Sequence, residues 1–192
     1  MKYLPYPEYR KISMHNLKPM TIILEAGSNW FTKTFENKIN KFPYKPPFTH
    51  ALIHIKNGDC VNVGFTTTIK KIKDVISKSH YYLAIELCGL NLIQIEEGQS
   101  IAYNEAGAAN SKFRFYDVWG FLCFGLRKLG LKVKGSEKYS FCSDQVVDTF
   151  SKMGEPLFKT MNGELTSPCD IYMKLQTYAN AKIRQIMTEE VV

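Results

Sequence analysis

Two apolar, β-branched runs that flank the dipeptide Asn57-Gly58 constrain the fold of this chain more than any other feature. The runs cover residues 50–55 and 60–65, and each has the length and composition of a β-strand. Asparagine and glycine both tolerate the positive φ angles that a two-residue hairpin turn requires. The sequence therefore predicts an antiparallel hairpin, and the domain must be built around the sheet to which this hairpin belongs.

The rest of the chain alternates between strand-like and helix-like patterns, which predicts an α+β fold. Short apolar or β-branched runs predict strands at residues 21–24, 81–87 and 90–95. Helical spacing of apolar residues predicts helices at 30–39, 68–79, 100–109 and 117–129, and two more that begin at Cys142 and at Ser167-Pro168. We expect a central antiparallel sheet that packs against the helix beginning at Cys142.

The length and composition are those of one globular domain with short appendages. The chain has 192 residues, of which 45% are hydrophobic and 22% charged. Residues 1–19 hold three prolines and predict an extended N-terminal arm. We expect the main domain at 20–176, followed by a polar C-terminal helix or tail at 177–192. A chain of this size buries a sufficient core without disulfides.

The five cysteines are widely spaced and form no CxxC pair, so we expect neither a zinc site nor any other metal or cofactor. No glycine-rich phosphate loop is visible. The polar, proline-broken start does not resemble a secretory signal, and the longest apolar stretches are too short to cross a bilayer. We therefore expect reduced thiols and a cytoplasmic location in a bacterium or host cell, or a place in a virion.

The net charge of +7 leaves two interpretations open. The lysines are dispersed along the chain, and the one dense run, Lys70-Lys71 with Lys73, alternates with isoleucines. This pattern favours a solvated basic face, which could contact an anionic surface. It disfavours nucleic acid as the main partner.

Cys142 is the best candidate for a nucleophile. It lies where a basic, glycine-containing loop gives way to a helix, and the partial positive charge of a helix N-terminus stabilises a thiolate. Backbone N–H groups at such a position can also hold a developing oxyanion. The alternative is a buried core cysteine, since cysteine is among the most often buried residues.

A nucleophilic cysteine needs a base, and His50 is the best placed histidine. It stands at the start of the first hairpin strand, whereas His54 lies near the turn, and His15 and His80 are predicted to be surface residues. Across the hairpin, Asn62 is a diagonal neighbour of His50 whose amide oxygen could orient the imidazole. The alternative for Asn62 is an exposed strand residue.

Several motifs of the chain resemble the circularly permuted branch of the NlpC-type papain-like superfamily, in which the histidine strand precedes the cysteine helix. The similarity covers about residues 20–176. It is carried by Phe48-Thr49-His50-Ala51-Leu52-Ile53, Phe115-Tyr116-Asp117, Tyr139–Asp148 around Cys142, and Ser167-Pro168-Cys169-Asp170-Ile171.

The resemblance implies a permuted papain-like fold with Cys142 as nucleophile, His50 as base and Asn62 at the third position, where many relatives carry an acidic residue. It further implies a cysteine hydrolase that cleaves an amide bond in a peptide or a peptidoglycan stem. Two alternatives stay open. The same site could serve an acyltransferase or lipid-directed hydrolase, as in the similar lecithin:retinol acyltransferase group. The domain could also be an inactive binding or structural module of a virus.

Overall fold

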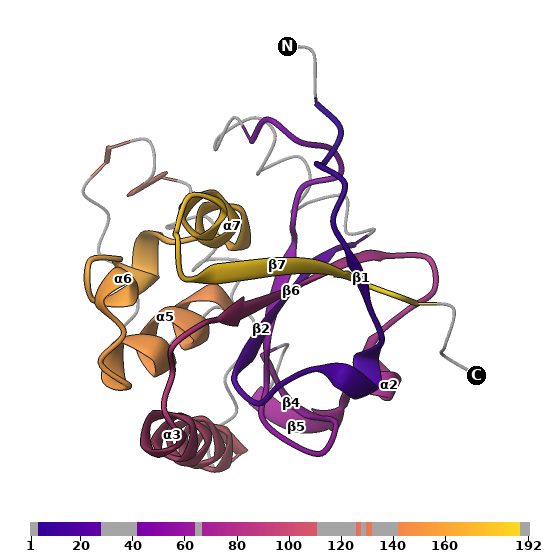
Figure 1. The fold of residues 1–192 in the computed structure, drawn as a ribbon. Coiled ribbons are helices and arrows are strands. Elements are labelled where there is room, and N and C mark those ends of the chain that lie inside the picture. Colours follow the sequence, from indigo (N-terminus) through magenta and orange to yellow (C-terminus); the bar gives the residue numbers. More distant parts are fainter. Residues whose placement is uncertain are drawn as a thin grey trace.

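The computed structural model describes residues 4–27, 42–63, 67–110, 126–127, 130–131 and 142–188. Within these ranges, a seven-stranded sheet has the order β1-β7-β6-β2-β3-β4-β5 (Figure 1). The strands are β1 Lys11–Ile12, β2 Thr21–Ala26, β3 His50–His54, β4 Asp59–Val63, β5 Thr67–Lys71, β6 Tyr81–Leu87 and β7 Ala181–Ile186. Neighbouring strands are antiparallel except for β1 and β7, which are parallel at one edge. The fold is therefore α+β, as predicted, with a mixed sheet.

The helical elements of the described residues differ widely in length. They are η1 Met14–Asn16, α2 Ile72–Val75, α3 Leu92–Asn110, α5 Cys142–Lys152, α6 Pro156–Lys159, η2 Gly163–Leu165 and α7 Pro168–Gln176. Figure 1 shows α3, α5, α6 and α7 gathered on one side of the sheet. The two helices that the sequence predicted to begin at Cys142 and after Ser167 are confirmed as α5 and α7.

The predicted hairpin is confirmed as β3–β4. Asn57 and Gly58 have φ angles of 54° and 75°, and the Asp59 N–H donates to the Lys56 carbonyl over 2.8 Å. Two consecutive positive φ angles suit the right-handed twist of the flanking strands, which is why Asn-Gly is favoured here. The turn fixes the register of the two strands, with Leu52 opposite Asn62.

Alternating strand residues enter two separate apolar clusters, as expected for a sheet covered on both faces. The first cluster joins Ile53 of β3 to Phe150 of α5 and Ile171 of α7. The second joins Leu52 of β3 to residues of the N-terminal arm and of α2, including Leu17. The arm is thus part of the core of the second face, and its β1 extends the sheet.

The predicted helix at 68–79 is wrong at residues 68–71, which belong to strand β5. Thr67 to Lys71 pair with β4 along their whole length, and only the four residues of α2 that follow are helical. The alternation of isoleucine with lysine suits an edge strand equally well, because exposed edge lysines prevent further strand pairing.

The predicted strand at 90–95 is also wrong, because α3 begins at Leu92. Asn91 Oδ1 accepts the Gln94 N–H over 2.9 Å, and Gln94 Oε1 accepts the Asn91 N–H over 3.1 Å. This reciprocal cap starts a helix. Leu92 and Ile93 are 78% and 76% exposed, so the apolar run does not mark a buried strand. The helix predicted at 100–109 is confirmed as the second half of α3.

The predicted C-terminal helix or tail at 177–192 is wrong where the structure describes it, since residues 181–186 form strand β7. This strand lies between β1 and β6 in the sheet. Pairing with β6 over five residue pairs overrides a polar sequence with little intrinsic strand signal. The predicted helix at 30–39, most of the helix at 117–129 and the loop at 132–138 lie outside the described residues.

Candidate active site

His50 and Asn62 form a hydrogen-bonded pair across the β3–β4 hairpin. Asn62 lies opposite Leu52, so it is the diagonal neighbour of His50 that the turn position predicts. The Nε2–H of His50 donates to Oδ1 of Asn62 over 2.7 Å. Because the amide oxygen can only accept, it fixes the proton on Nε2 and leaves Nδ1 for another partner.

Cys142 also interacts with the imidazole, and both its charge and a side-chain hydrogen bond act on His50. It is the first residue of α5, which packs directly against β3. Only 4% of Cys142 is exposed, and its neighbours in the first apolar cluster include Ala51 and Val146. Cys142 therefore belongs to an apolar cluster and also interacts with the ring of His50.

The electrostatic balance at His50 favours its charged form. Burial by itself would lower the pKa of His50, because it penalises the imidazolium. The charge of Cys142 and its hydrogen bond act in the opposite direction, and Asn62 and Glu25 add to them. Together these groups raise the pKa of His50 from 6.5 to about 9. At neutral pH the ring can therefore pair with a thiolate and donate a proton.

The first turn of α5 is fixed by two contacts with the segment around η2. Ser143 Oγ donates to the buried Thr166 carbonyl over 2.6 Å. Asp144 lies so close to Gly163 that a Cβ at this glycine would come within 2.0 Å of the Asp144 carboxylate. These contacts hold the helix start, and hence Cys142, in place.

Two residues near His50 were missed at the level of sequence, Glu25 of β2 and His80. Glu25 pairs with His50 in the β2–β3 register. The Nδ1–H of His80 donates to Glu25 Oε1 over 2.5 Å. His80 is therefore partly buried with a partner, whereas we predicted a surface residue. No local signal links these residues, because only the placement of β2 between β3 and β6 brings them together.

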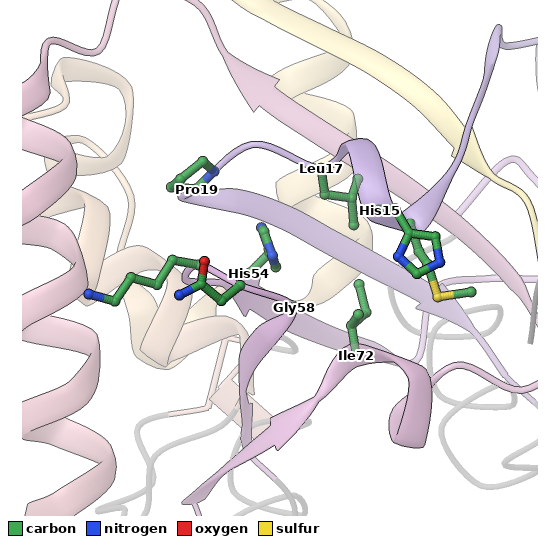
Figure 2. A pocket seen from close by; sticks show the side chains of 9 residues that line it. His15, Leu17, Pro19, His54, Gly58 and Ile72 are labelled. Atoms are coloured by element: carbon green, nitrogen blue, oxygen red, sulfur yellow. The ribbon is translucent and has the colours of Figure 1, made fainter.

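His54 belongs to a different part of the molecule. Its Nδ1–H donates to the Lys18 carbonyl over 2.8 Å, and burial lowers its pKa. It lines a cavity of about 410 Å³ with residues of the arm and the β3–β4 turn (Figure 2). The cavity lining consists of Met14, His15, Leu17, Pro19, His54, Lys56, Asn57, Gly58 and Ile72. Neither Cys142 nor His50 contributes to this lining, and the partner of His54 is the Lys18 carbonyl.

The other cysteines of the described residues have different surroundings. Cys60 is fully buried, and burial raises its pKa to about 12. Cys169 is buried and donates to the Phe48 carbonyl over 3.4 Å. Cys88 is exposed. Cys123 lies outside the described residues. Pairing with an imidazole therefore distinguishes Cys142 from the exposed Cys88 and from Cys60, whose thiol donates to the Lys70 carbonyl.

Metal binding and membrane insertion find no support in the part of the chain that the structure describes. Its His, Cys, Asp and Glu side chains form no group of three or more that could hold a metal ion. None of its helices combines the length and apolar character needed to cross a bilayer.

Comparison with known proteins adds no family assignment. The chain matches no protein-family model, and no curated protein matches it. The interpretation of the site therefore depends on its geometry.

Proposed function

We propose that this chain is a cysteine hydrolase in which Cys142 is the nucleophile, His50 the acid and base, and Asn62 the residue that orients His50. The observation that carries the proposal is the imidazole of His50, which interacts with both the Cys142 thiol and the Asn62 amide. A nucleophile, a base and an orienting group in this order define a catalytic unit of the Cys-His-Asn type.

The fold proposed with this function is a circularly permuted papain-like one. The histidine strand β3 precedes the cysteine helix α5 in the chain, and α5 packs on the sheet that carries His50 and Asn62. This order and this packing support the resemblance noted in the sequence.

The proposed reaction is the cleavage of an amide bond in a peptide or a peptidoglycan stem. The Cys142 thiolate attacks the carbonyl carbon, and the backbone N–H groups at the start of α5 stabilise the oxyanion. The C–N bond breaks as His50 gives its proton to the leaving amine, which produces a thioester on Cys142. Water then attacks the thioester, His50 takes a proton from this water, and the carboxylic acid leaves with regeneration of the thiolate.

Acyl transfer at the same site is a second candidate, favoured by the apolar surroundings of Cys142. An acyl acceptor other than water would then attack the thioester. The two reactions share every residue and differ only in the acceptor. Incubation with a thioester and an amine, followed by mass spectrometry, separates them: a new amide indicates transfer, and the free acid alone indicates hydrolysis.

Alkylation of Cys142 by iodoacetamide tests the proposed pair directly. The experiment uses a C88S/C123S background, which removes the exposed Cys88, and peptide mass spectrometry follows Cys142 separately from Cys60 and Cys169, which are buried as it is. A free thiol is only a few per cent thiolate at pH 7. We therefore expect His50→Ala to slow alkylation of Cys142 roughly tenfold or more. His15→Ala, at an exposed histidine of the arm, is the matched control and should change nothing.

Equal alkylation rates in the H50A and H15A variants would refute the pair and leave an inactive papain-like module as the better interpretation. Salt-sensitive binding of nucleic acid by Cys142→Ala protein would then identify such a module.

A further inference from the structure

The Glu25 carboxylate lies next to the proposed catalytic histidine on the neighbouring strand. Glu25 of β2 is the register partner of His50 of β3. Residues directly opposite on antiparallel strands have Cβ atoms roughly 5 Å apart, which is close enough for strong electrostatic coupling between their side chains. The charge of Glu25 indeed contributes to the raised pKa of His50.

The Glu25 side chain is held in a confined space. His80 donates to its Oε1 over 2.5 Å, and the side chains of Glu25 and His80 are only 14% and 21% exposed. A Cβ at Gly27 would lie 3.2 Å from Glu25 Oε1, 3.1 Å from Thr49 Oγ1 and 3.4 Å from His80 Cε1. The chain therefore encloses the carboxylate on several sides, and low exposure strengthens its interaction with nearby charges.

We infer that Glu25, held by His80, is a positioning residue that supplies a fixed negative charge beside the His50 ring and keeps this ring protonated and oriented. The inference rests on the proposed function, because it gives Glu25 a role only if Cys142 and His50 act together. A negative charge near the ring is needed because Asn62 orients the imidazole, but its neutral amide brings no charge to balance an imidazolium.

The groups around His50 and Glu25 support these roles, in which Asn62 orients the imidazole and Glu25 supplies the negative charge. His50 interacts with Cys142 of α5, Asn62 of β4 and Glu25 of β2. Glu25 is a carboxylate whose charge contributes to the raised pKa of His50.

Glu25 in turn faces His80 and Tyr82, the latter on β6. Burial raises the pKa of Tyr82, so its phenol stays neutral and does not add a competing charge. The carboxylate is therefore balanced by the His80 hydrogen bond and the His50 ring.

The test is the titration of the His50 ring by NMR in the full-length chain, in the wild type and in three variants. Glu25→Gln removes the charge and keeps the shape, and we expect the His50 midpoint to fall by roughly half a unit to one unit. His80→Phe removes the donor and should lower the midpoint by less. Glu97→Gln, at an exposed carboxylate of α3, is the control for net charge and should leave the midpoint unchanged.

A further variant, Cys142→Ser, distinguishes a failure of the proposed Cys142–His50 pair from a failure of the proposed role of Glu25. If C142S leaves the His50 midpoint unchanged, the proposed catalytic pair itself fails. If C142S lowers the midpoint and E25Q does not, the pair stands and the role of Glu25 is refuted. A loss of unfolding free energy in E25Q without a shift of the midpoint also refutes it, because a purely structural carboxylate would behave in this way. An upward shift in H80F would show that His80 opposes the charge of Glu25, which overturns its assignment as the holding group.

Discussion

At the scale of single residues, Asn62 decides which nitrogen of His50 carries the proton. An acidic side chain at this position would orient the ring and also stabilise its charge. The amide does only the first of these, through the 2.7 Å hydrogen bond to Nε2. Three elements therefore share the control of His50. Asn62 of β4 orients the ring, and Cys142 of α5 and Glu25 of β2 balance its charge.

Asn62→Ala is expected to reduce the reactive state of Cys142. A hydrogen bond to a charged group contributes roughly 1.5–3 kcal/mol, and its loss lowers the population of the thiolate–imidazolium pair about tenfold or more. The measurement is the rate of iodoacetamide alkylation of Cys142 at pH 7 in the C88S/C123S background. Asn104→Ala, at an exposed asparagine of α3, is the control. Equal rates in the two variants of folded protein would rule out an orienting role for Asn62.

At the scale of elements, the start of α5 depends on how closely η2 approaches it. Gly163 has no side chain, and this absence leaves room for the Asp144 carboxylate. The first turn of α5 carries both this carboxylate and Cys142. A residue larger than glycine at position 163 therefore requires the Asp144 carboxylate to move, in the same helical turn that carries the proposed nucleophile Cys142.

Gly163→Ala is expected to lower the free energy of unfolding by about 1–3 kcal/mol, because the added methyl group overpacks the contact with Asp144. Gly107→Ala is the matched control: a Cβ at Gly107 of α3 meets no atom within 4 Å, so alanine should raise the free energy of unfolding by roughly 0.5–1 kcal/mol. Urea denaturation measures both changes. A G163A variant as stable as the wild type would show that η2 does not constrain the start of α5.

The elements that could be predicted from sequence are those with a local physical cause. The turn at Asn57-Gly58 and the cap at Ser167 each depend on residues within a few positions of one another. The cap formed by Asn91 and Gln94 is of the same kind, and the correct spacing was present in the sequence. The prediction of a strand there relied on the apolar residues that follow Asn91, which are exposed in the first turn of α3.

At the scale of the whole molecule, the contacts that depend on the order of the strands in the sheet could not be predicted from the sequence. The hairpin placed Asn62 near His50, but nothing local indicates that β2 lies between β3 and β6. This order brings Glu25 to both His50 and His80. It also explains why β7 escaped prediction, since its strand conformation comes from its neighbours on both sides.

The last strand is a structural part of the sheet, and Ile186→Asp tests this directly. Ile186 is 2% exposed, lies opposite Ile12 of β1 and belongs to the second apolar cluster. An aspartate there would bury a charge without a partner, and we expect the free energy of unfolding to fall by more than about 3 kcal/mol. Lys182→Ala, at an exposed position of the same strand, should change it by no more than about 0.5 kcal/mol. Thermal and urea unfolding give both values. If I186D unfolds like K182A, the C-terminal segment contributes nothing to the core and the parallel pair of β1 and β7 is not part of the stable sheet.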